Sequence, residues 1–300
     1  MTGNDLHHLS AIVADQAEEI KDPAERTVRI IREAVAREVA GQAGVSLRRV
    51  YMAALRAGIW PLRYLRNSQS LSTQEQLRLA RARVAIIGAG GLGATVAILL
   101  ARMGVGSMTV VDADIFDESN LNRQLTAVSG TLGLGKAVTL KKDLLDINPA
   151  VEVRQVTERL TPENAATLLD QTDAVVDALD NVDDRLNLEK ACQKALIPLI
   201  HGAVAGFEGQ VMVVCPQKSG PGEPGLAGLY GRDDRFPAAA DMPEARLGVP
   251  GVTPAVVAGL QATETVKVLL NRGRIIKNRL LYIDLEQGGF QELPLSSDSD

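Results

Sequence analysis

Three glycines and one aspartate have the residue types and the spacing that nucleotide binding requires. Gly88, Gly90 and Gly93 form a GxGxxG pattern directly after an apolar run, and Asp112 ends the next apolar run. The first glycine allows a tight turn, the second lets the backbone approach a phosphate, and the third lets a helix pack close to a strand. A carboxylate in the position of Asp112 can accept hydrogen bonds from ribose hydroxyls. The pattern predicts an adenine-nucleotide site, without deciding between NAD and ATP.

The residues around this pattern predict a strand, a turn, a helix and a second strand. Residues 84–87 have the length and β-branched content of a buried strand, and residues 94–103 carry apolar side chains at helical spacing. Residues 108–111 form another short apolar run. The N-terminus of the helix would offer free N–H groups and the positive end of its dipole to an anion. This context favours a phosphate site over a glycine turn without a ligand.

Further charged residues follow at positions that suit the same ligand. Lys136 lies near the start of a helix predicted over residues 131–147, where a cation opposes the helix dipole, and this unfavourable placement indicates an anionic ligand. Asp177 and Asp180 follow a predicted strand, and ligands of open parallel sheets bind at the carboxyl ends of strands. Both are therefore predicted to point towards the crevice of the glycines. Asp180 suits either a magnesium ion or the cap of a helix over residues 182–195.

The first part of the chain, residues 1–57, predicts a helical appendage. Residues 28–39 carry an apolar stripe at helical spacing, and residues 47–55 predict a further helix. The charged faces of these helices are interpreted as solvated surface, with a partner-binding role as the alternative. Ser72 and Glu75 then have the spacing of a capping box, which predicts a short helix.

Residues 58–293 predict one α/β domain, and residues 294–300 a disordered tail. The order of predicted elements indicates a Rossmann-like, doubly wound, mostly parallel sheet that ends in an antiparallel hairpin after a helix over residues 252–270. The segment 216–250 is rich in Gly and Pro, so we expect either disorder or a functional lid. His201 ends a predicted strand, and a structural role is favoured over a catalytic one.

Composition excludes several classes of function. The net charge of −5 and the sequence pI near 5.4 argue against a general nucleic-acid or membrane-surface binder. Aromatic residues make up only 3%, which disfavours stacking on single-stranded nucleic acid. No apolar run has the length of a membrane span and the N-terminus lacks a signal-peptide layout, so we expect a cytoplasmic protein. The two cysteines, Cys192 and Cys215, cannot build a disulfide framework or a four-cysteine zinc site.

Nine motifs in this order resemble the ThiF/MoeB/HesA family, the bacterial relatives of the ubiquitin-activating enzymes. The resemblance covers about residues 60–293. Its motifs are Arg63–Asn67, the glycine turn, Asp112, Ser119–Gln124, Lys136, Asn148-Pro149, Asp177–Asn181, Phe207–Gln210 and Gly259–Glu264.

The resemblance implies binding of ATP with magnesium, and adenylation of the C-terminal glycine carboxylate of a small ubiquitin-like sulfur carrier protein. Asp112 would hold the ribose, and Asp180 the magnesium ion. Asn120, Arg123 and Lys136 would contact the triphosphate. The residues expected to bind the nucleotide are Gly88, Gly90, Gly91, Gly93, Asp112, Asp114, Asn120, Arg123, Gln124, Lys136, Asp180 and Asn181.

The chemistry implied by the resemblance explains these residue types. A carboxylate oxygen attacks the α-phosphorus and pyrophosphate leaves, so no proton has to be moved and no catalytic base is needed. Catalysis then consists of positioning and charge neutralisation. Arg66 is similar to the family arginine that reaches the ATP of the other subunit, which implies a homodimer. The expected catalytic residues are Arg66, Arg123, Lys136 and Asp180, and this charge clamp favours ATP over NAD.

The chain departs from the family pattern in its cysteines. Family members often carry two CxxC pairs for zinc and a cysteine in the crossover loop, and this chain has neither, so no zinc is expected. The expected enzyme is an adenylyltransferase that stops at the acyl adenylate. The alternatives are activation of another carboxylate, on a peptide or a modified tRNA nucleoside, a non-catalytic scaffold, and an NAD-dependent oxidoreductase.

Overall fold

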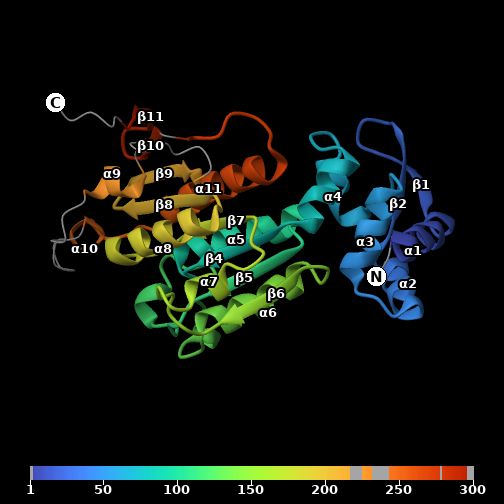
Figure 1. Cartoon of the computed structure of the whole chain (residues 1–300), viewed down its shortest axis with the longest axis horizontal. Helices are drawn as coiled ribbons and strands as arrows, with labels where there is room; N and C mark the ends of the chain where they lie inside the picture. Colours follow the sequence, from blue (N-terminus) through green and yellow to red (C-terminus); the bar gives the residue numbers. More distant parts are fainter. Residues whose placement is uncertain (1–2, 217–224, 232–242, 278, 296–300) are drawn as a thin grey trace. The chain divides into compact units, whose positions relative to one another are not determined.

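The computed structural model describes residues 3–216, 225–231, 243–277 and 279–295, and the chain divides into two compact units (Figure 1). Unit 1 holds the residues up to Ala82 together with Leu100–Ser107 and Leu144–Glu152. Unit 2 holds Arg83–Leu99, Met108–Asp143 and the residues from Val153 onward. The predicted boundary after residue 57 stays a prediction.

Unit 1 is built from short helices and a small sheet. Helix α3 is central to it, because Val50, Ala53 and Leu55 are fully buried. The Ser46 side chain caps this helix by accepting a hydrogen bond from the Arg49 amide. Its elements are α1 (Gly3–Asp15), β1 (Glu18–Lys21), β2 (Thr27–Ile31), α2 (Glu33–Ala43), α3 (Leu47–Arg56), β3 (Trp60–Pro61), the 3₁₀ helix η1 (Leu62–Asn67) and α4 (Thr73–Arg81). The predicted capping box of Ser72 and Glu75 is confirmed at the start of α4.

The prediction of an all-helical appendage is wrong for the residues between α1 and α2. Strands β1 and β2 pair antiparallel, and β3 joins β2 in parallel to give a three-stranded sheet. The Asp22 carboxylate holds the hairpin turn, because its Oδ1 accepts the amides of Ala24 and Arg26 at 2.8 and 3.0 Å. The β-branched run of β2 buries Ile30 and Ile31 in sequence, so sheet pairing outweighed the helical spacing.

Unit 2 contains an eight-stranded sheet in the order β11-β10-β9-β8-β7-β4-β5-β6. The pairs β4–β7 and β7–β8 are parallel, whereas β8–β9, β9–β10 and β10–β11 are antiparallel. The strands are β4 (Arg83–Ile87), β5 (Ser107–Val111), β6 (Glu152–Val156), β7 (Ala174–Asp177), β8 (Leu199–Ala205), β9 (Glu208–Val214), β10 (Arg279–Asp284) and β11 (Gly289–Pro294). The predicted fold class and the C-terminal hairpin are confirmed.

Helices cover both faces of this sheet. Side chains of a strand alternate between faces, and Val175 packs with Leu188 of α8, whereas Ala174 packs in the cluster of Val268 from α11. The helices of unit 2 are α7 (Ala165–Leu168), α8 (Val182–Ala195), α9 (Leu226–Tyr230), α10 (Pro243–Leu247) and α11 (Val252–Leu270), and α5 (Gly91–Met103) and α6 (Lys136–Ile147) begin in it. Two short 3₁₀ helices, η2 (Glu118–Asn120) and η3 (Ser129–Thr131), precede α6.

The segment predicted as a loop over residues 216–250 contains the two short helices α9 and α10. Residues 217–224 and 232–242, to which the expectation of disorder or a lid also applied, lie outside the described residues, as do residues 296–300 of the predicted tail. Within the part of the chain that the structure describes, no helix combines the length and the apolar character needed to cross a membrane.

Candidate functional site

The glycine turn between β4 and α5 is set by steric contact. Gly88 has φ +96°, and a Cβ atom there would lie 2.5 Å from the Ala178 carbonyl oxygen. A Cβ at Gly93 would lie 1.8 Å from the Gly88 carbonyl oxygen, so the helix can approach the turn only with glycine. A Cβ at Gly90 would meet only the Gln124 amide group, at 3.6 Å. The first and third glycines therefore close the turn, and the second leaves space above it.

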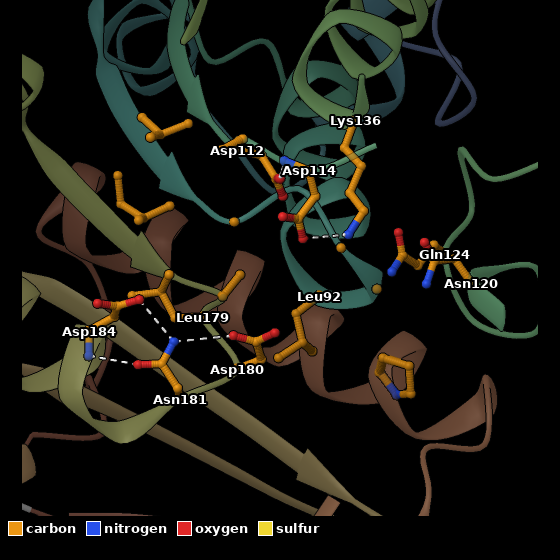
Figure 2. Close-up of a pocket in the computed structure, with 18 of the residues that line it drawn as sticks. Leu92, Asp112, Asp114, Asn120, Gln124, Lys136, Leu179, Asp180, Asn181 and Asp184 are labelled. Carbon is orange, nitrogen blue, oxygen red and sulfur yellow. Dashed lines mark hydrogen bonds and ion pairs between the residues drawn. The ribbon is translucent and has the colours of Figure 1, made fainter. Parts of the chain in front are cut away.

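That space is a cavity of about 500 Å³ at the carboxyl ends of the strands. Figure 2 shows Asp180 and Asn181 on one side, Asp112, Asp114 and Lys136 on another, and Asn120 and Gln124 on a third. The residues predicted for the nucleotide site that line the cavity are Gly88, Gly90, Gly91, Asp112, Asp114, Asn120, Arg123, Gln124, Lys136, Asp180 and Asn181. Gly93 lies beneath the turn. Arg66 is exposed at the end of η1 in unit 1, whereas every lining residue belongs to unit 2.

Asp112 is tied to the glycine turn by two backbone amides. Its Oδ2 accepts the Ala89 amide at 2.6 Å, and its Oδ1 accepts the Asp114 amide at 2.8 Å. Burial raises the pKa of Asp112, and the two amide bonds oppose that rise. Each carboxylate oxygen has a second lone pair, so the group can still accept a ribose hydroxyl.

Lys136 is the first residue of α6 and is 8% exposed. Its Nζ lies 3.0 Å from Oδ2 of Asp114, whose side chain is 52% exposed. The predicted helix over residues 131–147 begins later than expected, because the Lys136 amide bonds to the Asp114 carbonyl and Gly133 takes φ +79°. Asp114 therefore offsets the unfavourable placement of this cation at the helix N-terminus, and it holds the ammonium group at the cavity wall.

The segment after β5 brings an amide, a guanidinium and a second amide to the cavity. Asn120 is 8% exposed, and its Oδ1 accepts the Asp117 amide at 3.0 Å. Arg123 donates from Nη1 to the Ser119 carbonyl at 2.8 Å. Gln124 is 6% exposed, and its Oε1 has no hydrogen-bond partner among the described residues. A buried acceptor of this kind normally has a partner, so it fits a ligand donor.

Asn181, not Asp180, caps α8, which corrects one of the two alternatives for Asp180. The Asn181 Oδ1 accepts the Asp184 amide at 2.9 Å. Its Nδ2 donates to Asp180 Oδ1 at 3.3 Å and to Asp184 Oδ2 at 2.9 Å. Asp180 is exposed and directed into the cavity, and Asp184, which the sequence reading missed, joins it. The described residues contain no group of three or more His, Cys, Asp or Glu side chains that could hold a metal ion.

Two carboxylates suffice for a magnesium ion that keeps waters and phosphate oxygens as its other ligands. The cavity also favours such an ion electrostatically, because its carboxylates outnumber its cations. The lining carboxylates are Asp112, Asp114, Glu158, Asp180, Asp184 and Glu244, and the lining cations are Arg123, Lys136, Arg159 and Arg185. The donor set therefore fits a divalent cation.

The prediction that Asp177 points into the crevice is wrong. Asp177 is fully buried, and its Oδ2 lies 2.7 Å from His201 Nδ1 while its Oδ1 accepts the Leu179 amide. Burial opposes its ionisation, but the charge of Arg185 and the His201 hydrogen bond outweigh burial and lower the pKa of Asp177. Asp177 is the last residue of β7, and its side chain turns to the protein interior. His201 is also fully buried and is not among the described residues that line the cavity, and its structural role stays a prediction.

Arg185 lines the cavity and was not identified from the sequence. It is 7% exposed on α8, and its Nη2 donates to the Leu179 carbonyl while Nη1 donates to the Tyr230 hydroxyl at 3.0 Å. A signal for it existed, because Arg185 stands at helical spacing between the apolar residues Val182 and Leu188 of α8.

Comparisons with known proteins identify the family of the chain. The model of the ThiF family matches residues 64–300. The chain is 36% identical over 241 residues to the SAMP-activating enzyme E1 of Haloferax volcanii, covering 79% of this chain and 86% of that protein. It is 40% identical over 219 residues to the sulfur carrier protein adenylyltransferase of Thermus thermophilus, covering 73% of this chain and 80% of that protein.

Two further matches set the limits of the likeness. The chain spans half the length of adenylyltransferase and sulfurtransferase MOCS3 of Culex quinquefasciatus, at 37% identity over 75% of this chain. The crystal structure of E. coli MccB superposes with a TM-score of 0.67 at 21% identity, covering 78% of this chain and 69% of that one, which supports the fold. From the family match and the relatives above 30% identity, the chain belongs to the ThiF family and is an adenylyltransferase.

Proposed function

We propose that this protein catalyses ATP-dependent adenylation of the C-terminal glycine carboxylate of a small ubiquitin-like sulfur carrier protein and releases pyrophosphate. The observation that carries the proposal is the single cavity that brings together the glycine turn, Asp112, Arg123, Lys136 and Asp180. The names of the Haloferax and Thermus relatives support the substrate class.

Each group in the cavity has a task in this reaction. The glycine turn accommodates the phosphates at the N-terminus of α5, and Asp112 accepts the ribose hydroxyls. Arg123 and Lys136 neutralise the triphosphate while the carboxylate approaches. Since the nucleophile is already an anion, the site needs positioning and charge neutralisation rather than a base.

Asp180 would hold magnesium, with Asp184 beside it. The ion would neutralise the phosphates in a cavity whose own carboxylates outnumber its cations. Asp114 and Lys136 compensate each other, and Asp177 compensates Arg185. A tetra-anionic nucleotide would therefore meet Arg123, Arg159 and a Lys136 whose charge is partly offset by Asp114, and Mg²⁺ would supply the missing positive charge.

The reaction would stop at the acyl adenylate without a cysteine thioester. Cys192 is 1% exposed within the core, and burial raises the pKa of its thiol well above the ordinary value. Cys215 directly follows β9, where Val214 pairs with Leu199 at the beginning of β8. The cavity lies at the opposite, carboxyl end of the parallel strands. The chain has no other cysteine, and for the same reason no zinc site is proposed.

We propose a homodimer in which Arg66 reaches the partner's nucleotide. The segment between β5 and α6 exposes several apolar side chains, and contiguous exposed apolar surface marks an interface. Ile115 is 62% exposed, Leu125 60%, Val128 53% and Leu134 51%. We also propose that the reaction takes place in the cytoplasm, where ATP is available.

ATP–pyrophosphate exchange with Mg²⁺ tests the proposal. We expect exchange with one carrier that ends in Gly-Gly and none without a carrier. Exchange that is absent with every carrier, while ATP binds, would point instead to a peptide or modified nucleoside carboxylate. Failure to bind ATP in calorimetry would contradict the assignment and favour a scaffold or, if NAD binds, an oxidoreductase.

A further inference from the structure

A second cavity of about 160 Å³ adjoins the nucleotide cavity and shares four lining residues with it. The shared residues are Asp180, Arg185, Val204 and Glu244. Small residues of β8 and β9, such as Ala203 and Gly209, form one wall, and Tyr230 of α9 forms another. Among the described residues that line it, Arg185 is the only cation.

Helix α9 is held against α8 at both of its ends. Arg185 and Glu189 are four residues apart and therefore lie on one face of α8. Glu189 is 4% exposed, and its Oε1 accepts the Leu226 amide at 3.0 Å at the start of α9. A Cβ at Gly225 would lie 1.7 Å from that oxygen, so a larger residue there would displace the Glu189 carboxylate. Leu226 is fully buried.

The other end of α9 joins a chain of buried hydrogen bonds. The Tyr230 hydroxyl lies 3.1 Å from His201 Nε2 and 3.0 Å from Arg185 Nη1. His201 Nδ1 lies 2.7 Å from Asp177 Oδ2. Because Asp177 is ionised, Nδ1 carries the proton and Nε2 accepts from Tyr230. Arg185 therefore donates to the Tyr230 oxygen, Tyr230 to His201, and His201 to Asp177.

We propose that Tyr230 is a positioning residue for the carboxylate substrate, acting through Arg185. The inference rests on the proposed function, since a carboxylate must reach the nucleotide from an adjoining space. The second cavity shares Arg185 with the first, and a carboxylate that passes through it meets this guanidinium. The Tyr230 hydroxyl and the Gly202 carbonyl both accept from Nη1, while the Leu179 carbonyl accepts from Nη2.

The inference predicts that a change at Tyr230 weakens binding of the carrier more than binding of ATP. Tyr230→Phe removes the hydroxyl and keeps the ring, which packs edge-on against His201 with 5.7 Å between the ring centroids. We expect the KM for the carrier to rise about five- to tenfold, the size of one lost hydrogen bond of typical strength. The Kd for ATP should change less than about twofold, because the nucleotide contacts lie in the first cavity.

The experiment compares wild type, Tyr230→Phe, Glu189→Gln and the control Lys194→Ala, which changes an exposed residue of the same helix. Carrier-dependent exchange gives the KM, calorimetry gives the Kd for ATP, and amide hydrogen exchange follows residues 226–230. Glu189→Gln should raise the KM less than Tyr230→Phe and speed amide exchange in α9. Lys194→Ala should match wild type in all three measurements.

The outcomes distinguish a failure of the inference from a failure of the proposed function. If the KM for the carrier is unchanged in Tyr230→Phe, or if the Kd for ATP rises as much as that KM, the inference is overturned. Carrier-dependent exchange by wild type would still support the proposed function. If wild type shows no exchange with any carrier, the proposed function fails and the role of Tyr230 towards a carboxylate fails with it. If the amide hydrogens of α9 exchange at the wild-type rate in Glu189→Gln, Glu189 does not hold α9 against α8.

Discussion

The two sides of the nucleotide cavity use charge differently. On the side of the glycine turn, Asp114 and Lys136 form a partly exposed pair, with the Asp114 side chain 52% exposed. On the side of α8, the fully buried Asp177 carboxylate is compensated by Arg185 and accepts a hydrogen bond from the buried His201. The difference teaches that the first side keeps its charges available to a ligand, whereas the buried charges of the second side stabilise the fold. Substitution of the charges on the first side should therefore reduce activity with little loss of stability, whereas substitution of the buried charges on the second side should cost stability.

The largest expected effect on activity is at Lys136. Lys136→Ala should reduce carrier-dependent pyrophosphate exchange by about a hundredfold or more, because it removes a preorganised positive charge from the triphosphate. Its free energy of unfolding should change by less than about 1 kcal/mol, since the pair with Asp114 is partly exposed. Exchange rates and urea unfolding measure the two effects. Lys142→Ala, on the exposed face of the same helix, is the matched control, and full exchange by Lys136→Ala would contradict the assignment.

On the side of α8, Arg185→Met should instead cause a large loss in the free energy of unfolding. The change leaves the Asp177 carboxylate buried without its cation, which costs about 3 kcal/mol of folding free energy. Urea unfolding measures the loss, and Arg154→Met, at an exposed position of β6, should lie within about 0.5 kcal/mol of wild type. Equal stability of both variants would mean that the buried charges do not support the fold.

Asp180→Asn should act on metal dependence. Loss of one carboxylate ligand should raise the Mg²⁺ concentration for half-maximal exchange about tenfold, consistent with the weakening caused by changes at metal sites. A titration of exchange with Mg²⁺ gives this value. Asp183→Asn, the exposed neighbour outside the cavity, should keep the wild-type curve. Identical curves for Asp180→Asn and wild type would remove Asp180 from the metal site.

The smallest expected effect is a pH dependence carried by His201. Burial lowers the pKa of His201 below its ordinary value of 6.5, against the opposing hydrogen bond from Asp177. The unfolded state therefore binds the proton more readily, so this contribution to stability is present above about pH 6.5 and is lost as the pH falls towards the folded pKa. The charged groups that face His201 are Asp177 and Arg185, with the Tyr230 hydroxyl as its other partner.

Protonation of His201 would also remove the acceptor of the Tyr230 hydroxyl. The KM for the carrier in wild type should therefore rise a few-fold as the pH falls through the folded-state pKa of His201, which lies below its ordinary value, and exchange assays at a series of acidic pH values would measure this rise. Tyr230→Phe lacks that bond and should show a flatter profile. If the KM for the carrier changed with pH in the same way in both proteins, protonation of His201 would not act through the position of Tyr230.

The two sides also differ in how far the sequence predicted them. Gly88, Asp112 and Lys136 lie directly after strands or at a helix start, where spacing alone predicts the edge of the sheet on which they lie. The helices α8 and α11 were predicted with their observed bounds, because their apolar spacing and their flanking residues agreed.

The α8 side was harder to predict because it is assembled from distant segments. Arg185 and Glu189 meet α9 across 45 and 37 positions of the chain, and spacing carries no signal for such contacts. Asp177 was misplaced because the end of a strand can turn its last side chain to either face. In unit 1 the run of β2 suited a strand as well as a helix, and pairing with β1 decided it.

The central claim is adenylation of a protein carboxylate without a thioester. It is tested most directly by incubating the protein with Mg²⁺, ATP and a carrier that ends in Gly-Gly, and then measuring the intact masses of both proteins. We predict a carrier that has gained one AMP, with pyrophosphate released, and an enzyme of unchanged mass. A covalent enzyme–carrier adduct that a thiol cleaves, or a carrier without AMP while ATP is bound, would contradict the account.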